Sequence, residues 1–266
     1  MLIDTNTYAG HWPFRMLKNN SVQEVCDNAE KNGITHVVIA SLNAVFYKDP
    51  FDGNRELMEE IRACKTSVKI LPLAIVNPTY TGWEKYARKA IEEDGFCGFE
   101  ICPAYHGYTL LPSSNGYKRF YYAKEVMELA KEYDVPVRIT TCFENCRQRH
   151  LMDLQYDLKA DDICTLLSAC PGVSVIITGT NPMAFGKKMK EYAKKYDNVF
   201  FEISKIEGYA RDVMKKAAEF LGPEHLCFGT LSPFHYVQPS MLKLRYVDEF
   251  KDKGIEDNVK KIFKNI

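Results

Sequence analysis

The chain has 266 residues, of which 46% are apolar, and this is enough to bury one large core or two smaller ones. Its 35 basic and 35 acidic side chains give a formal charge of zero, so no basic surface favours nucleic acid or an anionic membrane as a partner. No apolar run reaches the roughly 18 to 20 residues that span a bilayer, and the N-terminus lacks the layout of a signal peptide, so we expect a cytoplasmic protein.

Short β-branched runs alternate with amphipathic stretches, which is the pattern of a parallel sheet wrapped by helices. We predict strands at 2–4, 36–40, 69–76, 98–102, 136–141, 174–178, 199–204 and 226–229. We predict helices at 21–31, 54–64, 83–93, 121–133, 161–169, 182–195, 207–221 and 239–250. Eight such units in about 250 residues indicate a TIM barrel. No linker divides the chain, so one α/β domain of the (β/α)8 type is expected over residues 1–266.

The segment 103–118 has no clear period and is rich in Tyr, Gly, Ser and Pro. It follows the fourth predicted strand, so we interpret it as a loop over the barrel mouth, where loops of this fold hold function.

Alternation along the strands places polar side chains inside the predicted barrel. The residues expected to point inward are Glu100, Cys102, Arg138, Thr140, Glu202 and Ser204. Charges buried without partners would cost several kcal/mol each, so Glu100, Arg138 and Glu202 must be neutralised by one another, by ligand or by water. A structural ion-pair network and a catalytic role both remain open for the two glutamates, and likewise for Asp4.

Five segments resemble the amidohydrolase-related (amidohydrolase 2) branch of the amidohydrolase superfamily. They are the first strand around Asp4, the run from Gly98 to Pro103 with the loop that follows it, the run from Val135 to Val137, the run from Pro171 to Gly179, and the run from Phe228 to Pro233. The resemblance extends over nearly the whole chain. It implies a metal over the barrel mouth, held by histidines of the first, fifth and sixth strands and an aspartate after the eighth.

At the matching ligand positions the chain has other residues. They are Asn6, Tyr8, Thr140, Thr178 and Leu231. Transition metals need imidazole, thiolate or carboxylate at roughly 2.0 to 2.3 Å. We therefore expect no metal cofactor, and a metal-independent protein. One alternative relocates the metal to Glu100, Cys102, His106 and His235.

Other candidates for chemistry follow the predicted strands. Glu144, Arg147 and His150 are three residues apart, which would place them on one side of a helical turn. Arginine binds carboxylates through a planar fork, so Arg15 and Arg147 suit an anionic substrate, although either could instead pair with Glu144 or Asp157 to pin loops. Glu100, Glu144, His106 and His235 are candidate acids or bases. We list Asn6, Tyr8, Arg15, Tyr105, Arg147 and His150 as candidate substrate-binding residues.

Cysteine chemistry offers two further hypotheses. Cys102 lies four residues before His106 and would be a nucleophile if the histidine activated it, but a small buried thiol is the simpler interpretation. Cys142 and Cys146 lack the second pair that a zinc site needs. The chain has nine cysteines, an odd number, mostly within apolar patterns, which favours free thiols over a disulfide framework.

These observations favour an amidohydrolase-like hydrolase that acts on a small carboxylated, amide or lactone substrate. Carbon–carbon bond cleavage is also open. Arg15 and Arg147 would hold the anionic end, one of the candidate acids or bases would activate water, and Asn6 and Tyr8 would orient the carbonyl. The alternative from another class is a non-catalytic barrel that binds a metabolite through the same mouth. The sequence leaves a homo-oligomer open.

Overall fold

The computed structural model describes residues 1–145, 147–156, 158–206, 211–246 and 255–263. Its strands are β1 (Ile3–Ala9), β2 (His36–Ser41), β3 (Lys69–Pro72), β4 (Ala74–Ile75), β5 (Phe99–Ile101), β6 (Ser113–Ser114), β7 (Arg119–Phe120), β8 (Val137–Thr140), β9 (Val175–Thr178), β10 (Val199–Glu202) and β11 (Leu226–Cys227). The α-helices are α1 (Val22–Lys31), α2 (Leu42–Phe46), α3 (Pro50–Ala63), α4 (Trp83–Lys89), α5 (Pro103–His106), α6 (Tyr122–Glu132), α7 (Ala160–Ala169), α8 (Gly186–Lys195), α9 (Arg211–Leu221), α10 (Val237–Tyr246) and α12 (Ile255–Ile262). Shorter or irregular turns are η1 (Ala90–Asp94), η2 (Pro182–Phe185) and η3 (Pro223–His225).

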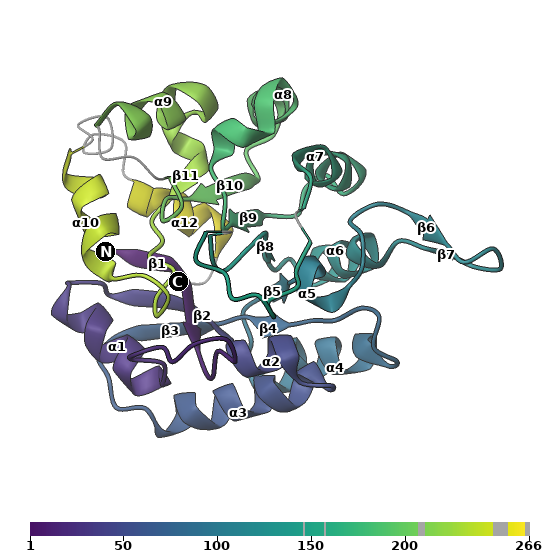
Figure 1. Ribbon diagram of the computed structural model, residues 1–266, viewed down its shortest axis with the longest axis horizontal. Coiled ribbons are helices and arrows are strands. Elements are labelled where there is room, and N and C mark those ends of the chain that lie inside the picture. The colour runs from purple at the N-terminus through teal and green to yellow at the C-terminus, as the bar shows by residue number, and fades with distance from the viewer. Residues whose placement is uncertain (146, 157, 207–210, 247–254, 264–266) are drawn as a thin grey trace.

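The strands form a closed parallel barrel with helices around its outside (Figure 1). Two parallel sheets, ordered β1-β2-β3 and β4-β5-β8-β9-β10-β11, make up its wall. They join where β3 runs into β4 through Leu73, whose amide donates to Ile39, and where the Thr5 amide donates to the Phe228 carbonyl at 2.9 Å. All eight predicted strands are therefore present, with β3 and β4 together forming the third, and the predicted (β/α)8 fold is confirmed.

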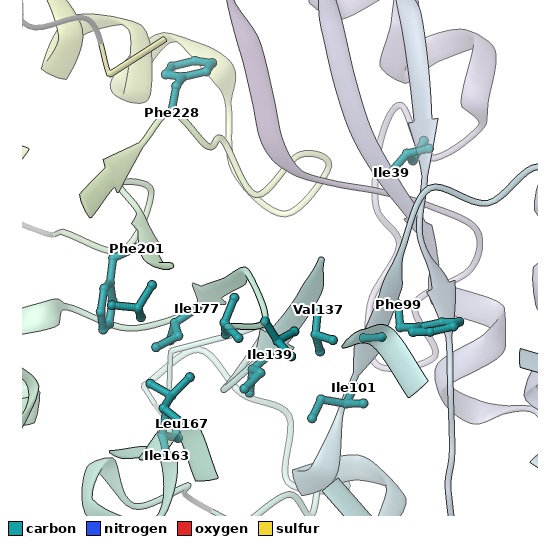
Figure 2. Close-up of a cluster of buried hydrophobic side chains, with 14 of the residues drawn as sticks. Ile39, Phe99, Ile101, Val137, Ile139, Ile163, Leu167, Ile177, Phe201 and Phe228 are labelled. Carbon is teal, nitrogen blue, oxygen red and sulfur yellow. The ribbon is translucent and has the colours of Figure 1, made fainter. Parts of the chain in front are cut away.

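The main hydrophobic core lies between the barrel wall and the helices. Phe99, Val137 and Phe201 point outward from their strands and are fully buried. Figure 2 shows this layer, in which Ile163 and Leu167 of α7 approach the outward side chains of β8 and β9. Alternation then directs the intervening residues into the barrel, which is why polar side chains collect there.

Local sequence signals set several helix boundaries. Ser21 caps α1 by accepting a hydrogen bond from the Glu24 amide, and the Glu24 side chain accepts one from the Ser21 amide. Pro182 follows the capping residue Asn181 at the start of η2, as its position predicts. The predicted helix 239–250 begins earlier, at Val237, and its last four residues lie outside the described part of the chain, as does the start of the predicted helix 207–221.

The segment 103–118 is more ordered than we expected from its composition. Pro103 starts the short helix α5, which ends where Gly107 adopts a left-handed conformation with φ of 69°. β6 and β7 then pair as an antiparallel hairpin that projects from the barrel (Figure 1). Helix α2 was also missed, because five residues are too few to display a helical period.

Within the described residues, no helix is long and apolar enough to cross a membrane.

Candidate functional site at the barrel mouth

A buried ion pair occupies the inside of the barrel. Arg138 of β8 donates to Glu100 of β5 through Nε at 3.0 Å and Nη2 at 2.5 Å, and both side chains are fully buried. The remaining Arg138 protons reach backbone carbonyls, including those of Thr5 and Val38. The structural interpretation of these two charges is thus supported, because each neutralises the other and neither contacts solvent.

Three of the positions matched to metal ligands join this pair in one hydrogen-bond network. The Tyr8 hydroxyl donates to Glu100 Oε1 at 2.9 Å, and the Thr140 hydroxyl donates to the same oxygen at 2.6 Å. Thr178 lies 3.0 Å from Thr140, oxygen to oxygen. Burial raises the pKa of Tyr8 well above its usual value, so the phenol stays protonated and remains a donor. The Tyr8 hydroxyl is therefore committed to Glu100 and does not face an open coordination site.

An aromatic plug covers this network, and we define it as Tyr8, Trp12, Phe14, Phe46, Tyr105, Phe143 and Phe234. Trp12 is its centre, with ring centroids 4.8 Å from Phe234 and 5.2 Å from Phe143. Edge-to-face contacts of this kind stabilise by about 0.5–1.5 kcal/mol each beyond the area buried. The plug fills the middle of the mouth, so any open site must lie to one side of it.

Glu144 lies beneath one edge of the plug. Its carboxylate accepts a very short hydrogen bond from Arg15 Nε and one of 3.2 Å from Trp12 Nε1, and the side chain is only 3% exposed. Of the pairings that the sequence left open for Arg15, the one with Glu144 is present, whereas Asp157 lies outside the described residues. Glu144 therefore fixes Arg15 and is not itself open to a ligand.

The open site is a cavity of about 510 Å³ beside the plug. Arg15, His235 and Ser204 contribute polar groups to its wall, and Phe234 and Tyr236 contribute rings. These residues follow β1, β10 and β11, so the cavity lies at the carboxyl ends of the strands, where sites of parallel barrels are found. The arrangement offers a cation, an imidazole and a hydroxyl to one small ligand.

Histidine protonation differs from what the sequence alone suggests. Burial, followed by the charges of Lys205, Lys243 and Arg15, lowers the pKa of His235 to about 4. Burial also lowers the pKa of His106 to about 4, and neither of its ring nitrogens makes a side-chain hydrogen bond within the described residues. His235 and His106 are therefore neutral imidazoles at neutral pH, but only His235 lines the cavity.

Several predicted residues lie away from the cavity wall. Arg147 and His150 are exposed, and His150 stacks on Phe14 with ring centroids 6.1 Å apart. The amides of Gln148 and Arg149 donate to the Asn145 carbonyl, as in a helical turn. Glu144 is nevertheless buried whereas Arg147 and His150 are exposed, so the expectation that the three side chains share one face is wrong. Tyr105 belongs to the aromatic plug.

The two cysteine hypotheses have different outcomes. Burial raises the pKa of Cys102 well above its usual value, and its thiol lies 3.8 Å from Glu100 Oε1, so the interpretation as an inert buried thiol is favoured. Cys142 donates to the Gly179 carbonyl at 3.0 Å, while its proposed partner Cys146 lies outside the described residues.

Two further carboxylates, those of Asp4 in β1 and Glu202 in β10, are also buried. Asp4 accepts hydrogen bonds from the Thr230 amide and hydroxyl, and Glu202 accepts from Ser204 and from the Gly179 amide. Burial, with a contribution from the Glu202 charge, raises the pKa of Asp4 from 3.8 to about 7. Asp4 thus binds a proton more tightly in the folded state than in the unfolded state.

This shift predicts a pH-dependent stability. The folded pKa exceeds the unfolded one, so the free energy of unfolding should fall as pH rises from about 4 to 7, by up to about 1.4 kcal/mol per pH unit. Asp4→Asn should flatten that slope, because the amide cannot ionise. Urea unfolding at several pH values measures it, with the exposed-site variant Asp52→Asn as control. An unchanged slope in Asp4→Asn would contradict the assignment.

Sequence reasoning missed some residues at the site. Ser204 was expected inside the barrel but not as part of a binding site, and Gln148 was not singled out. The available signal for Ser204 was its place at the end of the seventh predicted strand, where mouth loops begin.

The fold and the position of the cavity define the class of TIM-barrel proteins with a site at the carboxyl ends of the strands. Within that class the chain belongs to the Amidohydrolase family, whose model matches residues 3–264. No curated protein matches the chain.

Solved structures of low sequence identity share the fold. A protein from Staphylococcus aureus assigned as an amidohydrolase is 12% identical, with a TM-score of 0.72 over 99% of each chain. 2,6-Dihydroxybenzoate decarboxylase, complexed with 2,6-dihydroxybenzoate, is 11% identical, with a TM-score of 0.66 over 99% of this chain and 98% of that one. 5-Carboxyvanillate decarboxylase from Novosphingobium aromaticivorans, with bound manganese and a nitrobenzoic acid, is 13% identical, with a TM-score of 0.68 over 99% and 97%.

The residues at this barrel mouth do not fit a manganese ion of that kind. The hydroxyls of Tyr8 and Thr140 are committed to Glu100, and Leu231 has no donor atom. Asn6 alone retains an unpartnered side-chain oxygen, which is one neutral ligand. In the described part of the chain, no group of three or more His, Cys, Asp or Glu residues could hold a metal, so the relocated site gains no support either.

Proposed function

We propose that this protein is an enzyme that cleaves a small carboxylate-bearing substrate, by hydrolysis or by carbon–carbon scission, in the cavity beside the aromatic plug. The observation that carries the proposal is the convergence of Arg15, His235 and Ser204 on one cavity at the carboxyl ends of the strands. Decarboxylases of the same fold bind aromatic carboxylates, which supports a substrate of this class. A volume of about 510 Å³ suits such a molecule.

The proposed roles follow from the contacts. Arg15 is held through Nε by Glu144 and donates from Nη2 to the Phe234 carbonyl at 3.4 Å, which leaves Nη1 to orient the substrate. His235, neutral at neutral pH, accepts a proton from water or from the substrate. Glu202 accepts from the Ser204 hydroxyl at 2.8 Å and fixes its position in the wall. Asn6, Tyr8 and Glu100 are assigned to the support of the barrel interior, because none of the three lines the cavity.

We further propose that the reaction needs no transition metal, since four of the five matched ligand positions offer no free donor. Protein purified without chelator should contain much less than one equivalent of manganese or zinc by elemental analysis. Its turnover of a panel of lactones, amides and carboxylates should survive dialysis against chelator. Stoichiometric metal at the mouth, with activity lost on its removal and restored on its return, would overturn this part of the proposal.

A non-catalytic binding protein is the second candidate, and the aromatic plug that fills the centre of the mouth favours it. The same panel of lactones, amides and carboxylates distinguishes an enzyme from a binding protein. A binder gains thermal stability from a ligand but turns none over, and Glu144→Ala should weaken that binding because it frees Arg15. An enzyme shows turnover that falls in the same variant.

A further inference from the structure

One serine of the cavity wall is hydrogen-bonded to a buried carboxylate. Ser204 follows β10 and lines the cavity, and its hydroxyl donates to Glu202 Oε1 at 2.8 Å. Glu202 has no exposed surface, whereas Ser204 is 5% exposed. The hydrogen bond uses the hydroxyl proton and leaves lone pairs on the oxygen. A hydroxyl at a ligand cavity with a base within hydrogen-bond distance is the arrangement of an activated nucleophile.

The Glu202 carboxylate is held in a fixed orientation. Its Oε2 accepts from the Ser204 amide at 2.7 Å, and its Oε1 also accepts from the Gly179 amide at 3.3 Å. Gly229 leaves space for this side chain, because a Cβ atom there would lie 2.6 Å from Glu202 Oε2 and 2.8 Å from Glu202 Cβ. Backbone donors thus orient the base toward the Ser204 hydroxyl, as a third group orients the base of a catalytic triad.

We propose that Ser204 is a nucleophile that forms an acyl-enzyme with an ester, lactone or amide, and that Glu202 is its general base. Ser204 Oγ attacks the substrate carbonyl carbon while its proton passes to Glu202. Arg15, through Nη1, stabilises the negative charge that develops on the carbonyl oxygen. The bond to the leaving oxygen or nitrogen then breaks, and that atom takes the proton from Glu202.

The second half of the reaction uses His235 in the same cavity wall. A water molecule gives one proton to His235 while its oxygen forms a bond to the acyl carbon. The ester bond to Ser204 then breaks, Ser204 Oγ takes the proton back from His235, and a carboxylic acid is released. The inference rests on the proposed enzymatic function and selects hydrolysis over carbon–carbon scission.

An alkyl fluorophosphonate tests the nucleophile without a known substrate. A bond forms between the serine oxygen and phosphorus, the phosphorus–fluorine bond breaks, and fluoride leaves. Mass spectrometry of the treated wild type should show one adduct, on the peptide that contains Ser204, and Ser204→Ala should show none. Ser67→Ala is the matched control and should be labelled as the wild type is. Ser67 also donates to a carboxylate, that of Glu30, but it is exposed and precedes β3 at the amino end of the barrel.

Two further variants separate access from activation. Glu202→Gln cannot accept the proton, so its labelling rate should fall by about 10²-fold or more, at a melting temperature that shows a folded protein. Ser204→Cys places a thiol at the same position, and its alkylation by iodoacetamide should show that reagents reach this part of the wall.

No fluorophosphonate adduct on the wild type would overturn the proposal, and so would an unchanged labelling rate in Glu202→Gln. Turnover of the panel that survived in Ser204→Ala would overturn this inference and leave the proposed function standing. A wild type that was labelled at Ser204 but turned over no member of the panel would support the nucleophile and count against the proposed substrate class.

Discussion

Replacing Arg138 with methionine is expected to lower the free energy of unfolding by roughly 3–5 kcal/mol, because it leaves the Glu100 carboxylate buried and uncompensated. Both side chains have no exposed surface, and two guanidinium nitrogens contact Glu100 Oε2. Tyr8 and Thr140 donate to the other oxygen, but two neutral hydroxyls do not replace a full positive charge. Urea denaturation of the two proteins measures the difference.

The double variant Glu100→Gln with Arg138→Met identifies the cause. It removes both charges and keeps an amide oxygen for Tyr8 and Thr140, so it should recover most of the lost stability. Arg55→Met, which breaks an exposed pair with Asp52, should change the free energy of unfolding by less than about 0.5 kcal/mol. A loss in Arg138→Met no larger than this control would show that the buried pair does not stabilise the barrel.

The barrel could be predicted because its signals are local and repeated. Each strand is a short run of β-branched and aromatic residues. Side chains alternate between the two faces of a strand, so Glu100 and Arg138 are directed inward independently of distant parts of the chain. From the sequence alone, these two charges could be neutralised by each other, by a ligand or by water. Their pairing follows from β5 and β8 being neighbours in register, with Glu100 opposite Arg138.

The candidate site was less predictable because loop geometry decides it. Spacing alone grouped Arg147 and His150 with Glu144, yet the Asn145 side chain turns the chain and leaves both of them exposed. Arg15 and His235 each follow a predicted strand, and both line the cavity. Nothing in the sequence indicated that the plug around Trp12 would close the centre of the mouth and leave room only at one side.

His235→Asn should reduce turnover of the substrate found in the panel by about 10²–10⁴-fold, the usual contribution of a proton-transfer group. The imidazole lines the cavity, and its pKa of about 4 makes it a neutral base at neutral pH. In the wild type, kcat/KM should therefore rise through about pH 4 and then remain level up to neutral pH. Steady-state rates across this range test both expectations.

The pH at which kcat/KM rises, the acidic limb of the profile, also depends on the charges next to His235. After burial, the charge of Lys205 is the next cause of the lowered pKa, so Lys205→Met should move the limb to higher pH. His36→Gln, at the start of β2 and the opposite end of the barrel, should leave the profile unchanged. An unaltered rate in His235→Asn would remove this residue from the mechanism. An acidic limb that stayed in place in Lys205→Met would mean that the titrating group faces some other part of the mouth.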